Sequence, residues 1–435
     1  METIPKNTAY YPQDASIDTL RIFPAGNPRG VDVSKILVEL SYFEDIYSFV
    51  VSGYIILRDG LGLIEKLQLS GKETIKISFG KTREGRANVA KDFKIYSIPD
   101  RKPVGNQTTE YIKIYFCSPE LFTSEQTKVT KSYKGKSIHD IVYDIVSNQM
   151  RISPDKIKKT NFERTNGVYD FVIPTLKPLE AISWLSTYAK LLGVGTVGAD
   201  MLFYETKDGF EFRSLSNIYK SAPYKTYRYD IKNIEGRTFE QKITSVLDYQ
   251  FIKGFDSLNE INSGTFVNRV MAFDPLNRTV NVTDFNYTDY KGSRLNKGEP
   301  TDVTEYKDPR SSLKLVPTNS GQKVKPTFDI FKSVLPPDVF IQETVRNRTA
   351  QLALANYTIL KIRIPGDTGL KAGSVINFNI LSLDATKEKR DLDKYYSGKY
   401  LVTAVRHIIQ SQGIFQTILE ITKDSSQAKY EDYRP

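Results

Sequence analysis

Two separate stretches of the chain carry the same pattern of alternating apolar and polar residues. The first lies near residues 52–116 and the second near residues 265–421. Because successive side chains of a β-strand point to opposite faces, this alternation predicts strands with one buried face. Each stretch also contains a Gly-Asp or Asp-Gly turn and a closing strand. A chain that repeats such a module has an internal pseudo-symmetry, which constrains its fold more than any other feature of the sequence.

The alternation also predicts which side chains form the core. In the first stretch it is clearest in ETIKISF and EYIKIYF, and in the second in ILKIRIP and SVINFNI. Short strands separated by turn residues are typical of antiparallel sandwiches and barrels. The predicted barrel core consists of Ile75, Ile77, Phe79, Ile112, Ile114, Phe116, Ile362, Ile364, Ile376 and Phe378.

Between the two stretches the period changes from strand to helix. SIHDIVYDIVSNQM has apolar residues at helical spacing, with Ser137 as the predicted N-cap. A second helix is predicted to begin at Pro178, because proline is favoured at the first helical position. The Lys207-Asp208-Gly209 link joins two apolar runs and predicts a hairpin. This middle region is therefore predicted to be a small α/β domain.

The 435 residues exceed one typical domain of roughly 150 residues. The predicted fold class is α+β, mainly β, with two related antiparallel β-barrel domains, a small α/β domain and an irregular insertion. In the second barrel, strands before and after the insertion are expected to close one sheet. The predicted boundaries are an N-terminal arm at 1–34, a first barrel at 35–118, the α/β domain at 119–245, a second barrel at 246–289 and 357–424, an insertion with a helix at 290–356, and a C-terminal tail at 425–435.

The residues needed for most enzyme chemistry are missing or badly spaced. The two histidines, His139 and His407, have no clustered ligands for zinc and no G-x-S-x-G elbow to suggest a catalytic triad. The glycines from Gly193 to Gly198 follow a predicted helix and precede a strand, the reverse of a dinucleotide-binding loop. Asp391 and Asp393 stand in a charged loop. We therefore predict no catalytic residue, no cofactor and no metal.

Composition and charge limit the classes of function that remain. The net charge of +10 permits contact with nucleic acid, but the densest basic patch, around Lys156, Lys158 and Lys159, is better explained by a solvated loop. No apolar run approaches the ~18 residues that span a bilayer. The N-terminus has no pattern of a signal peptide, and the single Cys117 is expected to be a buried apolar residue. Assembly in the cytoplasm is the expectation.

The order of the segments resembles the baseplate hub proteins of contractile-tailed bacteriophages. The resemblance begins with SGYIILRDGLGLIEKLQLSGKETIKISF, DFKIYSI and EYIKIYFCSPE, and continues with SYKGKSIHDIVYDIV and FVIPTLKPLEAISWLSTYA. Later segments are MLFYETKDGFEFRSL, SVLDYQFIKGFDSLNEINSGTFVNRVMAFDPLNRT, IRIPGDTGLKAGSVINF and SGKYLVTAVRHII. It covers most of the chain, and its specificity comes from order and spacing rather than from a short motif.

The resemblance implies a structural virion protein of the tail baseplate. Hub proteins of this family are homotrimers in which each chain supplies two related barrels, so that three chains form a pseudo-sixfold ring. The implied partners are the tail tube protein, the spike or spike-lysozyme protein, other baseplate proteins and the tape-measure protein. Phage DNA would pass through the lumen without specific binding. Lys76, Lys94 and Lys113, or Lys361 and Arg363, would face either the lumen or the outer solvent.

Three alternatives stay open at this point. The first is the related hub of a type VI secretion or other contractile injection machine. The second is a basic, β-rich nucleic-acid-binding protein, whose affinity would fall steeply with salt. The third is a hydrolase that uses one of the two histidines.

Overall fold

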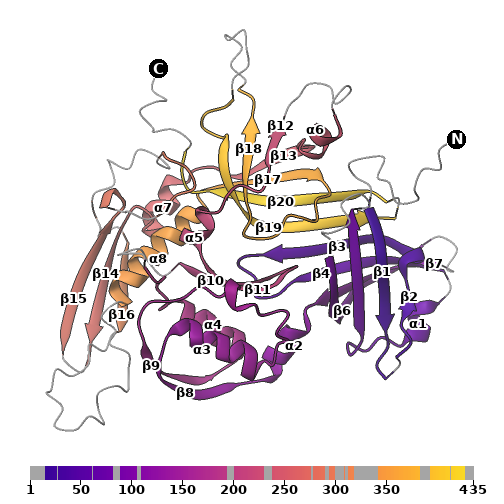
Figure 1. The fold of residues 1–435 in the computed structure, drawn as a ribbon, viewed down its shortest axis with the longest axis horizontal. Coiled ribbons are helices and arrows are strands. Elements are labelled where there is room, and N and C mark those ends of the chain that lie inside the picture. The colour runs from indigo at the N-terminus through magenta and orange to yellow at the C-terminus, as the bar shows by residue number, and fades with distance from the viewer. Residues whose placement is uncertain are drawn as a thin grey trace.

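The computed structural model places most of the chain in two barrels, an α/β domain and a separate small sheet (Figure 1). The part of the chain that the structure describes comprises residues 15–26, 28–60, 62–81, 89–104, 109–193, 200–229, 238–275, 278–289, 293–298, 308, 312–317, 341–382, 392–411 and 413–426. The predicted fold class, mainly β with two related antiparallel barrels, is confirmed.

The first barrel is an antiparallel sheet built around apolar side chains. Its strands are β1 (Ala15–Phe23), β3 (Leu37–Asp45), β4 (Ser52–Asp59), β5 (Thr74–Lys81), β6 (Val89–Val104) and β7 (Thr109–Cys117), with the short β2 (Val31–Asp32) and helix α1 (Leu63–Leu67) beside them. The strand order is β3-β4-β7-β6-β5-β1-β2. Two side chains from the far end of the chain, Ile409 and Phe415, complete its core.

The second barrel is built mainly from the C-terminal part of the chain. Its strands are β12 (Thr226–Tyr229), β13 (Asp248–Lys253), β17 (Thr358–Pro365), β18 (Val375–Ile380), β19 (Gly398–Gln410) and β20 (Phe415–Lys423), with helix α6 (Phe239–Ile243) before β13. β12 pairs with β18, and the main chain of Arg228 also bonds to Thr244 and Val246, just before β13. β12 thus lies between β18 and the segment that leads into β13, which closes the second barrel.

In Figure 1 the α/β domain lies below the second barrel and to the left of the first. It contains α2 (Pro119–Gln126), β8 (Val129–Lys136), α3 (Ile138–Asp144), β9 (Tyr169–Leu176), α4 (Pro178–Ser186), β10 (Met201–Thr206), β11 (Gly209–Ser214) and α5 (Leu215–Tyr219). The hydroxyl of Ser137 accepts from the Asp140 amide, and Pro178 opens α4, so both predicted helix starts are observed. The predicted hairpin is β10–β11, with Thr206 opposite Gly209.

A three-stranded sheet stands apart from the barrels. β14 (Val267–Asp274) lies between β15 (Thr279–Asn286) and β16 (Leu313–Pro317), and α8 (Ile341–Ala355) covers one face, with α7 (Ser257–Ser263) nearby. The prediction that strands before and after the insertion close one sheet is wrong for this hairpin. Alternation identified β14 and β15 as strands, but it carries no information about the partner, and their apolar face packs on α8 instead.

Three predicted segments differ from the observed elements. Within the predicted N-terminal arm, residues 15–23 form β1, because Leu20 and Ile22 are buried against β5. Within the predicted α/β domain, β12 joins the second barrel, where Tyr227 enters the core. Ser425 and Ser426, in the predicted tail, are buried, and Ser425 bonds to Asn296 in the predicted insertion. The rest of the tail lies outside the described residues.

Candidate functional site

The two barrels repeat the same order of strands. The first contains the antiparallel series β5-β6-β7-β4-β3, and the second contains β18-β19-β20-β17-β13. The two series also occur in the same order along the chain: β3, β4, β5, β6, β7 and then β13, β17, β18, β19, β20. The strand added at the side differs, because β1 runs antiparallel to β5 whereas β12 runs parallel to β18.

One continuous sheet joins the two barrels. The order β13-β17-β20-β19-β3-β4-β7-β6 takes four strands from each barrel and joins them through a ladder between β19 and β3. In that ladder Ala404 lies opposite Asp45 and Gln410 lies opposite Glu39. We call this sheet the shared wall. The candidate functional site is this wall, because it is where the repeated modules form one surface.

The inner side of the joint is packed with aromatic rings. His407 on β19 stacks on Tyr42 of β3, with ring centroids 5.9 Å apart, and it contacts Phe79 and Phe415. Its Nδ1 lies 2.9 Å from the hydroxyl of Thr417. Burial lowers the pKa of His407 to about 3, so the ring is neutral at physiological pH. This histidine therefore fills the joint as a neutral ring.

The outer side of the wall carries charges that are already engaged within the chain. The guanidinium of Arg406 lies 3.2 Å from the Glu39 carboxylate and donates to the hydroxyl of Tyr54 at 2.7 Å. The ammonium of Lys113 lies 4.0 Å from the centre of the Tyr54 ring. Such cation–π and ion-pair contacts partly satisfy these cations without a ligand.

A single buried carboxylate joins the two barrels to the α/β domain. Glu44, on β3 of the first barrel, accepts from the amide of Lys207 in the β10–β11 turn at 2.6 Å. Its other oxygen accepts from the amide of Ala372, in the second barrel, at 3.0 Å. The hydroxyl of Tyr42 donates, at 3.0 Å, to the same oxygen that accepts from Lys207. Burial raises the pKa of Glu44, although these bonds oppose the shift.

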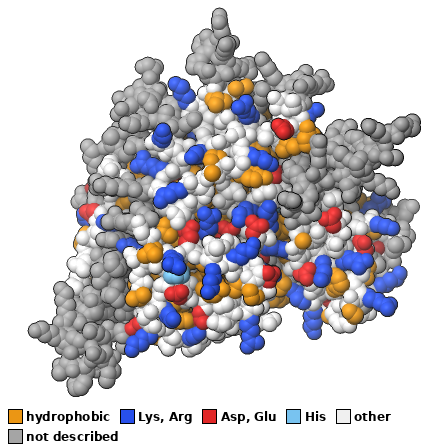
Figure 2. All heavy atoms as spheres, viewed as in Figure 1, with side chains coloured by type: hydrophobic (Ala, Val, Ile, Leu, Met, Phe, Trp, Pro, Cys, Tyr) orange, Lys and Arg blue, Asp and Glu red, His pale blue; other side chains and the backbone are white. Residues whose placement is uncertain are grey.

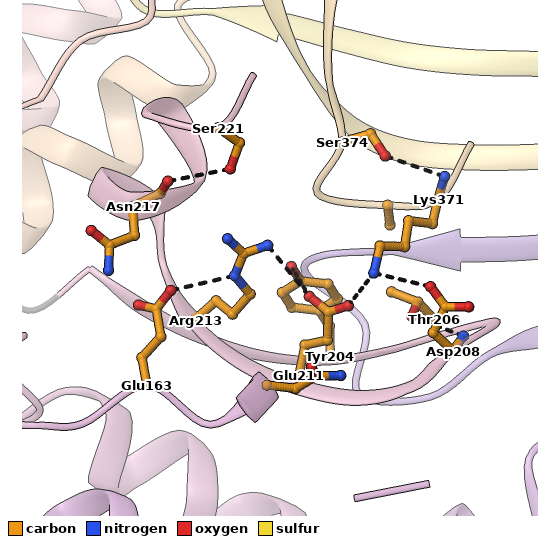
Figure 3. A network of polar contacts seen from close by, with 12 residues as sticks. Glu163, Tyr204, Thr206, Asp208, Glu211, Arg213, Asn217, Ser221, Lys371 and Ser374 are labelled. Carbon is orange, nitrogen blue, oxygen red and sulfur yellow. Dashed lines mark hydrogen bonds and ion pairs between the residues drawn. The ribbon is translucent and has the colours of Figure 1, made fainter. Parts of the chain in front are cut away.

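The β10–β11 hairpin is held between the barrels by further ion pairs (Figure 3). The ammonium of Lys371, from the second barrel, lies 2.6 Å from Glu211 and 3.1 Å from Asp208. On the other side, Lys91 of β6 lies 2.8 Å from Glu205, a pair that is almost completely buried. Figure 2 shows acidic and basic side chains together across the middle of the same face, near β10 and β11 in Figure 1. The hairpin thus bonds to both barrels and fixes their positions relative to each other.

The structure places all ten predicted core residues inside the barrels. Each is exposed by 1% or less. Those of the first stretch belong to one apolar cluster and those of the second to another.

The residues considered for enzyme chemistry lie apart from the wall or in its core. His139 contacts Thr165 in the α/β domain, with Nδ1 3.3 Å from the hydroxyl, far in sequence and structure from buried His407. Cys117 is buried, and burial raises its thiol pKa to about 12. Asp391 and the glycine-rich segment after Gly193 lie outside the described residues. Within the described ranges no cluster of His, Cys, Asp or Glu is arranged to hold a metal.

The residues that join the domains, such as Glu44 and Lys371, are not among the residues predicted from the sequence. Glu44 stands in SYFEDI as an ordinary charged residue, and Lys371 in GLKAGS as an ordinary turn residue. The only available signal was that Glu44 follows the apolar residues Tyr42 and Phe43 within a predicted strand, where a buried carboxylate would need hydrogen-bond donors. Across the described part of the chain, no helix has the length and apolar character to cross a membrane.

Comparison with known proteins agrees with the resemblance seen in the sequence. No family model matches the chain. The probable baseplate hub protein gp334 of Vibrio phage KVP40 is 24% identical over 428 residues, which cover 92% of this chain and 93% of that protein. The predicted resemblance to baseplate hub proteins is confirmed by this match.

Two solved structures share the fold. One is a tail protein from Neisseria meningitidis MC58, with a TM-score of 0.52 at 10% identity, covering 93% of this chain and 96% of that one. The other is the 43 kDa tail protein of prophage MuSo2 from Shewanella oneidensis, with a TM-score of 0.53 at 8% identity, covering 94% and 99%. At these identities the likeness concerns the arrangement of the chain alone.

Proposed function

We propose that this chain is a structural baseplate hub of a contractile phage tail, located in the virion. In this proposal three copies form a ring of six similar barrels, which joins a sixfold tail tube to a threefold central spike. The observation that carries it is the repeated strand order within one continuous wall. A threefold ring can present sixfold contacts only if each chain supplies the contacting unit twice. The match to a phage hub protein along most of the chain supports the same conclusion.

The partners follow from this geometry. One rim of the ring would meet the tail tube protein and the other the spike or spike-lysozyme protein, with other baseplate and tape-measure proteins close by. The proposed role needs no catalytic group, cofactor or metal. It needs a stiff angle between the two barrels, because that angle sets the curvature of the ring. Glu44 and the Lys91–Glu205 pair supply this stiffness, since each crosses a boundary between domains.

The outer face of the shared wall would line the channel for DNA. Cations on a channel wall slow a polyanion unless they are neutralised nearby. Here Arg406 pairs with Glu39, and Arg363 lies 3.1 Å from Asp248. Lys361 on β17 stands opposite Glu420 on β20. Mixed charges of this kind support passage of DNA without specific binding.

Light scattering after size-exclusion chromatography tests the proposal. The expected mass is three times the chain mass of 49.5 kDa. Antibody labelling of intact virions is expected to mark the baseplate end of the tail. A chain that is monomeric at all concentrations, and that is absent from virions, contradicts the proposal.

A further inference from the structure

The long strand β19 changes partner along its length. Its first part pairs with β18, with Gly398 opposite Phe378 and Leu401 opposite Val375. Its second part, from Ala404 to Gln410, pairs with β3 of the other barrel. The register against β20 shifts where the partner changes, between Val402 and Ala404. One strand thus belongs to its own barrel first and to the neighbouring barrel afterwards.

Strand β6 is the counterpart of β19 in the first barrel. Its first part pairs with β5, from Val89 to Lys94, and its register against β7 shifts between Ile95 and Ser97 and again between Ser97 and Asp100. The second part, as far as Val104, pairs with β7 on one side only. Among the described residues, no strand lies on its other side. β19 pairs with a strand of the other barrel in the same chain, whereas the second part of β6 has no such partner in the described part of the chain.

Strand β13 is the counterpart of β3. Tyr249 stands opposite Ile362 of β17, as Leu40 stands opposite Ile55 of β4. The second edge of β3 is covered by β19. β12 contacts the segment just before β13 through Arg228, but in the described part of the chain no strand pairs with the second edge of β13 itself. The wall therefore ends in two free edges whose counterparts contact each other inside the chain.

Exposure distinguishes the free edges from their covered counterparts. On β13, Phe251 is 42% exposed and Ile252 is 52% exposed. On β6, Tyr96 is 49% exposed and Ile98 is 37% exposed. In the covered joint, by contrast, Leu40, Tyr42 and Ile409 are exposed by 1% or less. Beyond β13, Phe255 and Leu258 extend the exposed apolar surface.

We infer that the free edge of β6 in one copy lies against β13 of the next copy, as β19 lies against β3 within the chain. This inference rests on the proposed ring and identifies the surfaces that close it. The contact is head-to-tail, because the two edges differ, and such contacts form closed rings when the rotation per copy closes. Its occupant is a second copy of this chain, since the chain already contains the template for the contact.

Two prolines make the contact between copies differ from the template. Pro99 and Pro103 lie in the free part of β6, and proline has no amide hydrogen to donate. We therefore expect fewer main-chain hydrogen bonds than between β19 and β3, and a larger share of side-chain contacts. The prolines also protect this edge from adding unrelated strands before the ring forms.

The template gives a register that cysteine cross-linking can test. Asp100 stands opposite Lys113 as Arg406 stands opposite Ile418, so Lys102 is the counterpart of Ile408. Gln250 stands opposite Lys361 as Ser41 stands opposite Tyr54. Because Ile408 and Ser41 are partners, Lys102 and Gln250 of adjacent copies are expected to be partners.

The test uses the full chain with Lys102→Cys and Gln250→Cys, oxidised and run on a non-reducing gel. Covalent species of up to three chains are expected. The matched control is Lys102→Cys with Lys361→Cys, because Lys361 lies one strand further from the edge. That strand adds about 5 Å to the separation, which places the control pair beyond disulfide reach. The control is expected to stay as single chains. Native Cys117 is buried and does not compete.

A second variant tests the same edge without a cross-link. Ile252→Glu places a carboxylate on an exposed side chain of β13, so the single chain is expected to fold, while the trimer is expected to weaken on the order of tenfold or more. A trimer that keeps its wild-type strength in this variant, or that gives no Lys102–Gln250 cross-link, overturns the edge assignment and leaves the proposed function standing. A chain that is monomeric by light scattering in every variant and in the wild type contradicts the proposed function, and the edge assignment with it.

Discussion

The two barrels share a wall but differ inside. The interior of the first barrel is apolar and aromatic, and Ile409 and Phe415, which belong to β19 and β20, complete it. The second encloses the carboxylate of Asp367, which lies 2.7 Å from the Lys225 ammonium and accepts from the Tyr227 hydroxyl at 3.0 Å. The strand order that forms the wall is repeated, whereas the side chains inside the two barrels differ. The wall is the part on which the geometry of the proposed ring depends, and each interior needs only to fill its own barrel.

The largest effect is expected from removing the carboxylate that joins the barrels. Glu44→Ala leaves the part-buried amide of Lys207 and the buried amide of Ala372 without their acceptor, and we expect it to lower the free energy of unfolding by about 5 kcal/mol. Urea denaturation followed by circular dichroism measures this. Glu125→Ala, which removes an exposed partner of Lys177, is the control and is expected to cost less than about 1 kcal/mol. Equal costs in the two variants would mean that Glu44 does not hold the joint.

A slightly smaller loss of stability is expected when the Phe415 ring is removed. This ring belongs to β20 of the second barrel but lies in the core of the first barrel. Phe415→Ala empties space beside Phe79 and His407, and we expect a loss of about 4 kcal/mol. Because Phe415 belongs to a strand of one barrel and to the core of the other, both barrels are expected to unfold in one transition. Calorimetry checks this. Two separate transitions in the wild type would contradict the interlocked arrangement.

The ends of two equivalent strands predict a difference in pH dependence. Lys423, the last residue of β20, is the counterpart of Ser118, which follows β7 in the first barrel. Burial lowers the pKa of Lys423 to about 7. The unfolded chain keeps this proton up to about pH 10.4, so between pH 7 and 10 the unfolded state binds more protons than the folded one. Stability should therefore rise with pH in this window, by at most about 1.4 kcal/mol per pH unit from this group.

Lys423→Met is expected to remove that rise, because methionine fills a similar volume without titrating. Denaturation midpoints at several pH values measure the slope. Ser118→Ala, at the equivalent end of the first barrel, is the control and should leave the slope unchanged. An identical slope in the Met variant would show that another group is responsible.

The smallest effect is expected on DNA. The wall's cations are engaged with Glu39, Asp248 and the Tyr54 ring, so the protein is expected to bind duplex DNA only weakly at physiological salt. Fluorescence anisotropy measures this. Glu39→Gln frees Arg406 and is expected to strengthen binding a few-fold at low salt. Tight, salt-sensitive binding by the wild type would favour a nucleic-acid-binding role over the hub.

Sequence reasoning recovered the strands but not their partners. Alternation in Ile75, Ile77 and Phe79 identified the buried face because a period of two depends only on local geometry. β12 has four residues and β1 is flanked by proline and glycine, so neither showed a clear period. The separate sheet of β14 and β15 was missed because sheet membership depends on packing over long distances along the chain.

The site was less predictable than the fold. The resemblance indicated repeated barrels, but nothing local in SYFEDI indicates that Glu44 binds main-chain groups more than a hundred residues away. The pairing of β19 with β3, from which the ring contact is inferred, likewise joins segments from opposite ends of the chain. Such contacts emerge only when the whole chain is folded.

Electron cryomicroscopy of the purified oligomer would show how the barrels are arranged. We expect a threefold ring of six barrels in which the contact between copies repeats the geometry of β19 on β3. An oligomer of another symmetry, or one in which the two barrels of each chain lie at different radii from the axis, would rule out the proposed ring.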